Sequence, residues 1–343
     1  MNRQELKTLC ELDGISGRET AVRTYLLDQL AGCPAVKQTQ VDPLGNLLVW
    51  VQGKRRAVHR VLFSAHMDEV GMMVTGVTEE GYLTVSPVGG VDPAVAYGRT
   101  VRVNGRTGVI GGKAIHQCSG EEKKALPGWD KLLVDIGAEG QHQAEQAARP
   151  GDAVVFDSEW KELSGGLCKA KALDDRVGCL LLLELIRRVP EYDMMVSFVT
   201  QEEIGLRGAA AAGFTLQPDI AVVVEATTAA DLAGVPGVKR VCEVGGGPVV
   251  SFMDGRTLYD GELYRRIRQI AGEASIPAQT KTMIAGGNDA GALQQAGAGA
   301  RVAAISLPCR YIHSPSCVLS WRDVEETLAL LTLLADTLPG EGA

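Results

Sequence analysis

Buried strands alternate with amphipathic helices in the C-terminal half of this chain, and this alternation restricts the fold more than any other feature. Apolar runs that predict strands lie at 194–200, 219–225 and 301–308, and helical patterns lie at 174–189, 257–275 and 321–338. Such alternation is typical of an α/β sheet with helices on both faces. We therefore predict an α/β fold in which a mixed sheet is sandwiched by helices.

The middle of the chain has a different pattern. Between residues 72 and 163 Gly and Val dominate, the apolar runs are short, and turn residues recur, as in EEGYLTVSPVGGVDPAVAYGRT. This pattern favours a small β-rich domain. We expect it to be inserted at 72–163 into an α/β domain that is split into 1–71 and 164–343. The length of 343 residues allows about two domains.

The N-terminal segment predicts two helices, at 1–14 and 21–32. The first is charged, which argues against a signal peptide. Ser16 and Glu19 stand just before the second helix with the spacing of a capping box. We therefore expect both side chains to cap that helix.

Charge, hydropathy and cysteine spacing exclude several partners. The net charge is −8, the two signs are interspersed, and there is no Lys/Arg-rich run, so nucleic acid is not expected. No apolar stretch reaches the ~18 residues of a membrane span, so no membrane partner is expected. The 8 cysteines are scattered without a CxxC pair, which favours the reducing cytoplasm.

Histidine and carboxylate side chains stand where the predicted strands end. They are His66 with Asp68 after VLFSAH, Glu202 and Glu203 after VSFVTQ, Glu225 at the end of IAVVVE, His313 in CRYIH, and Asp174 with Asp175 where a loop enters a helix. Open α/β sheets bind ligands beyond the carboxyl ends of their strands. We therefore expect these groups to meet at one rim of the sheet.

This set of side chains has the chemistry of a hydrolytic metal site. Histidine and carboxylate without cysteine suit zinc or a similar divalent ion. Two His and three carboxylates can hold two ions when one carboxylate bridges them, as in two-metal aminopeptidases and phosphatases. A remaining carboxylate can then act as general base.

Each residue also has a structural explanation when it is taken alone. His66 would be a core histidine at a strand end, and His313 would be a turn residue. Glu202 and Glu203 would begin a helix, whose first turn favours carboxylates. The shared position at strand ends favours the catalytic interpretation.

Four stretches, in this order, resemble the motifs of tetrahedral, dodecameric di-zinc aminopeptidases, which include glutamyl and deblocking aminopeptidases: SAHMDEVG, ALDDRVG, QEEIGLRGA and RYIHSP. The resemblance covers essentially the whole chain, with GVIGGKAIH, VDIGA and GDAVVF in the inserted domain. It implies a metallo-aminopeptidase that removes N-terminal residues from short peptides. It also implies dimers, formed through the inserted domain, that assemble into a dodecamer.

The resemblance implies specific roles for the residues at the strand ends. Two divalent ions per subunit would be bound, most simply zinc, with cobalt and manganese as alternatives. The ligands would be His66, Asp174 and Glu225 for one ion, and Asp174, Glu203 and His313 for the other, with Asp174 as the bridge. Glu202 would be the general base, and Asp68 would orient His66.

Several assignments have alternatives. Asp231 competes with Glu225 as the last ligand of the first ion. Asp175 is assigned to helix capping or to pairing with Arg176, which leaves Asp174 for the bridge. The chain also departs from the family pattern, because Glu225 stands where such aminopeptidases often have Asp, and Asn288 stands where we expect Thr.

Other activities compete with aminopeptidase activity. A di-zinc deacylase or carboxypeptidase would use the same scaffold, and Glu225 is the more common choice in related carboxypeptidases. Glycoside hydrolysis also uses two carboxylates, but aromatic residues make up only 5% of the chain, which leaves few platforms for sugars. A non-catalytic scaffold would not require the base Glu202.

Overall fold

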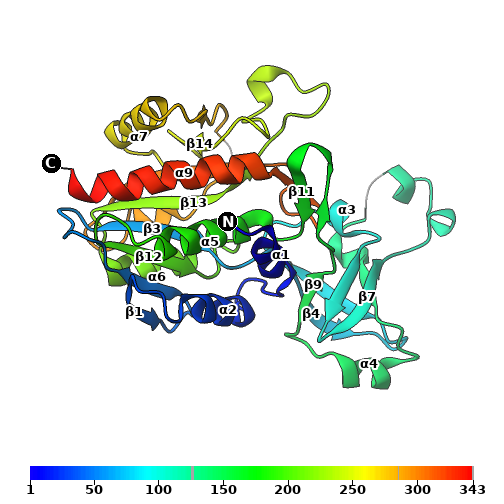
Figure 1. Cartoon of the computed structure of the whole chain (residues 1–343). Coiled ribbons are helices and arrows are strands. Elements are labelled where there is room, and N and C mark those ends of the chain that lie inside the picture. The colour runs from blue at the N-terminus through cyan, green and yellow to red at the C-terminus, as the bar shows by residue number, and fades with distance from the viewer. Residues whose placement is uncertain (125–126, 285, 342–343) are drawn as a thin grey trace.

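A mixed β-sheet forms the centre of the larger body in this computed structural model, which describes residues 1–124, 127–284 and 286–341 (Figure 1). Within those ranges the sheet has eight strands, in the order β1 (Val36–Val41), β2 (Leu47–Val51), β12 (Met194–Val199), β3 (Val61–His66), β13 (Ile220–Thr228), β16 (Arg301–Cys309), β14 (Val249–Val250) and β15 (Gln279–Thr280). β12, β3, β13 and β16 run parallel, whereas β2 joins β12 and β14 joins β16 in antiparallel pairs. The carboxyl ends of the parallel strands therefore meet at one edge of the sheet.

Helices cover both faces of this sheet. One side carries α1 (Arg3–Glu11), α2 (Thr20–Leu30), α5 (Leu173–Arg187), α7 (Gly261–Glu273) and α9 (Trp321–Thr337), and the other carries α6 (Arg207–Leu216) and α8 (Ala290–Leu293). Side chains of β13 alternate between the two layers, with Val222 and Val224 on the first side and Ala221 and Val223 on the second. Both faces of the parallel strands are thus buried, and the predicted α/β fold is confirmed. Across the described ranges, no helix combines the length and the apolar character needed to cross a membrane.

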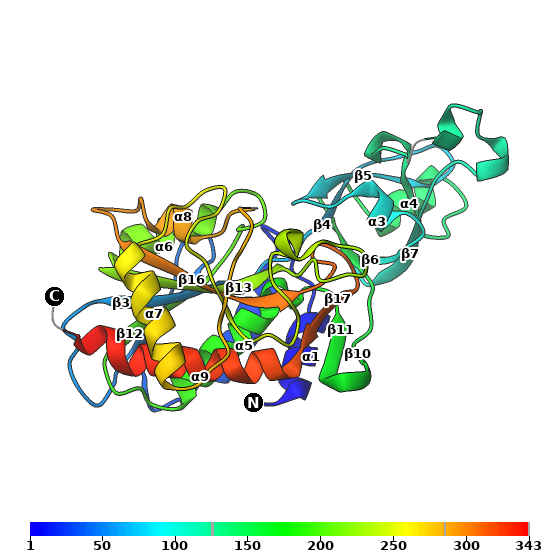
Figure 2. The ribbon, with the colours of Figure 1, turned by 90° about the horizontal axis from the view of Figure 1, so that it is seen from above.

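The smaller body is a closed β-barrel that projects from one end of the larger one, and Figure 2 shows the same separation from above. Its strands in the described residues are β4 (Gly71–Val77), β5 (Leu83–Val88), β8 (Leu133–Asp135), β7 (Arg106–Gly111), β6 (Thr100–Val103) and β9 (Ala153–Phe156), with helices α3 (Pro93–Ala96) and α4 (Gln141–Ala147) outside it. β4 pairs with β9, Met72 opposite Val154, and this pairing closes the barrel. The small β domain expected from the sequence is present; its boundaries at 72 and 163 stay a prediction.

A small antiparallel sheet connects the barrel to the larger body. It contains β10 (Lys161–Glu162), β11 (Leu167–Ala170) and β17 (Cys317–Ser320). β11 leads into α5, and β17 follows the segment that carries His313. Single 3₁₀ turns complete the described structure at Ile115–Gln117, Glu122–Lys124, Trp129–Lys131, Ser164–Gly166, Gly237–Lys239 and Leu338–Gly340.

The start of α2 differs from the prediction. Glu19 occupies the N-cap position, but no side chain caps this helix, so the predicted capping box is wrong. Ser16 and Glu19 are instead buried and form hydrogen bonds to Asp68 and to the backbone of Gln201. Long-range partners therefore replace the local cap that the spacing predicts.

Candidate active site

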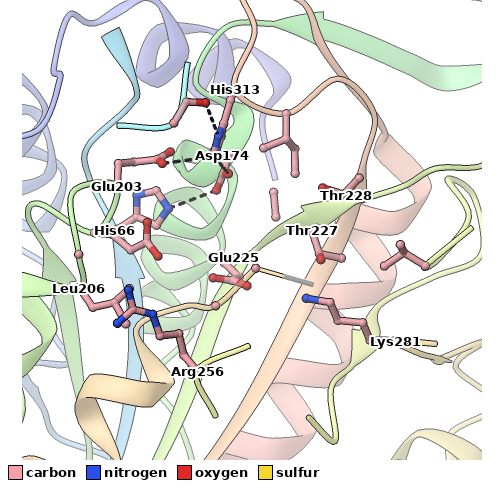
Figure 3. A pocket seen from close by; sticks show the side chains of 18 of the residues that line it. His66, Asp174, Glu203, Leu206, Glu225, Thr227, Thr228, Arg256, Lys281 and His313 are labelled. Carbon is pink, nitrogen blue, oxygen red and sulfur yellow. Dashed lines mark hydrogen bonds and ion pairs between the residues drawn. The ribbon is translucent and has the colours of Figure 1, made fainter. Parts of the chain in front are cut away.

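Six of the seven predicted site residues line one cavity of about 630 Å³ at the carboxyl edge of the parallel strands (Figure 3). They are His66, Asp174, Glu202, Glu203, Glu225 and His313. The seventh, Asp68, is fully buried beside His66. His66 ends β3, Glu225 lies in β13, and Asp174 lies in the first turn of α5. Glu202 and Glu203 follow β12 and His313 follows β16, as the strand-end pattern predicts.

The His66 ring has a fixed orientation. Its Nδ1 lies 3.1 Å from the backbone oxygen of Asp68 and 3.4 Å from the Asp68 carboxylate. An Nδ1–H that donates to these acceptors leaves Nε2 with its lone pair in the cavity. Nε2 lies 3.2 Å from Oδ1 of Asp174, so His66 presents a ligand atom next to a carboxylate oxygen.

The His313 ring is oriented by the barrel body. Its Nδ1 lies 3.0 Å from the backbone oxygen of Gly90, which follows β5. Its Nε2 lies 3.2 Å from Oε2 of Glu203 and 3.8 Å from Oδ2 of Asp174. The two imidazoles therefore face opposite oxygens of Asp174, an arrangement suited to a bridging carboxylate.

The spacing of these atoms fits metal coordination. Ligand atoms of His66, Asp174 and Glu203 all lie within 4.8 Å of one another. Two ligands of one tetrahedral zinc ion lie roughly 3.4 Å apart, given Zn–N and Zn–O bonds of about 2.1 Å. This group combines residues of both proposed sites, since it contains Glu203 rather than Glu225 beside His66 and Asp174. Asp174 lies between the two histidines, so the two proposed sites are close together.

The carboxylates of the cavity repel one another. Burial, followed by the charge of Asp174, raises the pKa of Glu225 to about 8. Burial also raises the pKa values of Glu202 and Glu203 well above their ordinary range, and neighbouring carboxylates reinforce the shift. For His66, burial acts to lower the pKa, but hydrogen bonds to Asp174 and Asp68 raise it. A cation bound among these groups would relieve the repulsion, so the donor set fits divalent metal ions.

Asp68 holds the loop that carries the paired glutamates. Its Oδ1 accepts the backbone N–H of Glu202 at 3.0 Å, and its Oδ2 accepts that of Glu203 at 3.1 Å. Burial alone would raise the pKa of Asp68, but the hydrogen bonds from His66 and Ser16 lower it. Asp68 thus stays ionised and connects His66 to both glutamates.

The structure separates Glu225 from its competitor Asp231. Both oxygens of Asp231 accept hydrogen bonds from Arg310, at 2.7 and 2.6 Å, so its charge is already balanced. Glu225 lines the cavity, and its Oε1 accepts a hydrogen bond of 2.9 Å from the side-chain amide of Asn288. Of the two carboxylates, Glu225 lines the cavity, whereas Asp231 is paired with Arg310.

Asp175 has the capping role rather than the pairing role. Its Oδ1 accepts the N–H of Gly178 within α5, and its Oδ2 accepts the N–H of His66. Arg176 pairs with Glu69 and with backbone carbonyls instead. Backbone angles at Asp174 and Asp175 are not helical, which lets the two side chains diverge from the start of α5.

Sequence reasoning missed two contacts made by the GGNDAG stretch. It marks Asn288 as a departure from the family pattern but does not predict its bonds to Glu225 and to the Tyr259 hydroxyl. It did not single out Asp289, which is 1% exposed and whose carboxylate has no hydrogen-bond partner in the described part of the chain. Its charge contributes to the raised pKa of Glu202.

The sequence profile of the M42 glutamyl aminopeptidase family matches residues 45–330 of this chain. The chain belongs to the M42 family. Two curated relatives of this family member are similar over nearly their whole length. A lysyl aminopeptidase of Pyrococcus furiosus is 31% identical over 97% of this chain and 96% of the relative. A glutamyl aminopeptidase of Lactococcus lactis is 30% identical over 98% and 96%.

A solved structure extends the similarity to three dimensions. The Pyrococcus horikoshii TET1 peptidase, which can assemble into a tetrahedron or a large octahedral shell, has a TM-score of 0.85 and 32% identity to this chain. The match covers 97% of this chain and 99% of that one. This M42 family member is a metal-dependent aminopeptidase that uses divalent ions, and the predicted family, fold and activity are confirmed. Glycosidase, deacylase and carboxypeptidase activities are not favoured.

Proposed function

We propose that this aminopeptidase binds two divalent ions, most simply zinc, with cobalt and manganese as alternatives. One ion would be held by His66, Asp174 and Glu225, and the other by Asp174, Glu203 and His313. The observation that carries this proposal is the position of the two Nε2 atoms, 3.2 and 3.8 Å from opposite oxygens of Asp174. Imidazole and carboxylate ligands suit these ions.

Glu202 is the proposed general base. When bound, the ions would polarise the scissile carbonyl and lower the pKa of the attacking water. Glu202 removes a proton from that water and passes it to the leaving amine. Asp68 supports this step because it fixes the backbone N–H of Glu202 and the ring of His66.

The proposed substrates are short peptides with free N-termini, and the proposed assembly is a homo-oligomer that reaches a dodecamer through dimers. The barrel is the proposed dimer contact. It exposes large apolar side chains, of which Val109 is 44% and Ile115 is 67% exposed, and a dimer contact there would bury them. The assembly of the similar TET1 peptidase supports this proposal. All eight cysteines are free thiols, which supports a cytoplasmic location.

One experiment tests the activity and the end of the peptide that is cleaved. Protein stripped with a chelator would be assayed before and after addition of zinc or cobalt, on short peptides with free and with acetylated N-termini. Metal-restored release of N-terminal residues from the free peptides alone is expected. Cleavage of blocked peptides only, or from the C-terminus, would instead indicate a deacylase or a carboxypeptidase.

A further inference from the structure

The segment 14–19 lies outside the cavity, yet it contacts the loop that carries the proposed base. Ser16 and Glu19 are each 3% exposed, although both have polar side chains. Buried polar atoms are retained where they form hydrogen bonds. The partners of these two side chains are therefore informative about their role.

Ser16 binds the carboxylate that organises the site. Its hydroxyl donates to Oδ2 of Asp68 at 2.5 Å. The same carboxylate accepts the N–H groups of Glu202 and Glu203 and lies 3.4 Å from Nδ1 of His66. Rotation of the Asp68 carboxylate would disturb all of these contacts, and the bond from Ser16 opposes that rotation.

Glu19 binds the residue just before the paired glutamates. Its Oε1 accepts the N–H of Gln201 at 3.1 Å and that of Gly17 at 2.6 Å. Gln201 has a φ of 58°, a left-handed conformation that is unfavourable for a residue with a side chain. Three consecutive backbone N–H groups, at 201–203, thus donate to Glu19 and Asp68.

The segment itself is anchored on a buried ion pair. The backbone oxygen of Gly14 accepts the N–H of Glu69 at 3.0 Å, and the N–H of Gly14 donates to the Glu69 carboxylate at 3.1 Å. That carboxylate also accepts from the ammonium of Lys171 at 2.6 and 2.8 Å. These hydrogen bonds fix the backbone of the segment that carries Ser16 and Glu19.

We propose that Ser16 and Glu19 are positioning residues for Glu202. They hold the backbone at 201–203 so that the Glu202 carboxylate faces the attacking water. Neither residue is among the described residues that line the cavity, so both act through Asp68 and the loop rather than on the peptide. This inference rests on the proposed role of Glu202 as general base.

The test compares Ser16→Ala with Ser16→Thr in the full-length, metal-loaded protein. Assayed in saturating metal, so that metal content matches that of the parent, Ser16→Ala is expected to lower kcat about 10- to 100-fold, the usual range for residues behind a metal site, while KM stays unchanged. Ser16→Thr keeps the hydroxyl and should restore most of kcat. Amide hydrogen exchange at 201–203 should become faster in Ser16→Ala but not in Ser16→Thr, a readout that is independent of activity.

A second pair of variants covers the case in which Ser16→Ala does not fold. Glu19→Gln keeps an oxygen that can accept the Gln201 N–H, whereas Glu19→Ala removes it. Glu19→Ala should therefore lower kcat and speed exchange at 201–203, and Glu19→Gln should change both much less. Equal kcat and exchange in these two variants would overturn the role of Glu19.

Ser197→Ala is the matched control, because its buried hydroxyl bonds to Ser64 at 2.8 Å within the sheet and forms no hydrogen bond to any described site residue. It should lower stability without lowering kcat. The inference is overturned when Ser16→Ala keeps the kcat and exchange of the parent protein, or when Ser197→Ala loses kcat equally. A normal rate in Glu202→Gln would instead remove the base assignment itself, so the two failures are distinguishable.

Discussion

Adjacent glutamates differ in their surroundings. The Glu203 carboxylate lies 3.2 Å from Nε2 of His313, next to the proposed bridging carboxylate. The Glu202 carboxylate lines the same cavity without a hydrogen bond or ion pair to any described residue, and the charge of Asp289 acts on it. These surroundings support the proposed roles of Glu203 as a ligand and of Glu202 as the general base.

Glu202→Gln should separate catalysis from metal binding. The amide cannot accept a proton from water, so kcat should fall by about 10²- to 10⁴-fold, the contribution of general acid–base catalysis. Metal content, measured by elemental analysis after gel filtration, should equal that of the parent. Glu203→Gln is the comparison variant and should lose metal; loss of metal in Glu202→Gln would contradict its assignment as base.

Asn288→Ala should weaken metal binding through Glu225. The lost 2.9 Å hydrogen bond would free the Glu225 carboxylate to rotate, and such supporting contacts are worth about 10- to 100-fold in metal affinity. Competition with a chromophoric chelator measures this change. Asn104→Ala, which removes an amide bonded within the barrel, should keep the parent affinity. Equal affinities in all three proteins would show that Asn288 does not position the ligand.

Local sequence patterns explain which site residues could be predicted. Strand ends are visible in hydropathy, so His66, Glu203 and His313 could be placed on one rim. Ser16 could not be assigned, because its spacing to Glu19 is that of a helix cap, and its partner Asp68 is 52 residues away. Short-range spacing carries no information about a contact of that separation.

Some secondary-structure elements could likewise be predicted from the sequence, and others could not. The longer helices of the larger body follow from their periodicity and its parallel strands from their apolar runs, and α9 spans Trp321–Thr337 against a predicted 321–338. The shorter helices α6 and α8 were not predicted. Closure of the barrel could not be predicted, because it depends on the pairing of Met72 with Val154. Periodicity identifies strands but leaves their partners open.

A tight turn after β5 brings the barrel against the site. Gly89 has a φ of +83°, and a Cβ there would lie 2.9 Å from Cγ1 of Val70 and 3.3 Å from Cβ of Glu203. Gly90, the next residue, supplies the carbonyl that orients His313. The small size of Gly89 therefore allows the barrel to approach two proposed ligands.

Gly89→Ala should impair the site while the barrel stays folded. Strain at positive φ costs roughly 1–2 kcal/mol, and the added Cβ would displace Glu203 and the carbonyl at position 90. Weaker metal binding and lower kcat are expected, measured by calorimetric titration and a peptide assay. Gly105→Ala carries the same strain, at φ +77°, with no atom within 4 Å of the added Cβ. It should lose stability only; equal effects of both variants on metal binding would contradict the contact argument.

At the scale of the whole molecule, the buried carboxyl groups of the cavity make the stability of the metal-free protein depend on pH. Glu202, Glu203 and Glu225 all have raised pKa values, each caused first by burial. A carboxylate with a raised pKa in the folded state contributes stability at low pH that is lost as the pH rises. The metal-free protein should therefore become less stable between the ordinary glutamate pKa of 4.5 and the value of about 8 for Glu225.

Unfolding of chelator-stripped protein at pH 6 and pH 8 measures this dependence. Each carboxylate that ionises only on unfolding lowers stability by at most about 1.4 kcal/mol per pH unit, so the metal-free protein should unfold at lower denaturant at pH 8. The metal-loaded protein should show the opposite slope, because ions bind ionised ligands and release protons. Parallel slopes with and without metal would refute this account of the cavity.

The late position of His313 in the chain, after the other proposed ligands, has a consequence for synthesis in the cell. His313 follows β16, the last strand of the central sheet in chain order, whereas its proposed partners Asp174 and Glu203 lie far upstream. A nascent chain that has not yet emerged from the ribosome past position 313 lacks one imidazole of the centre. The peptidase would thus remain inert while it is being translated, when other newly made polypeptides with free N-termini lie close by.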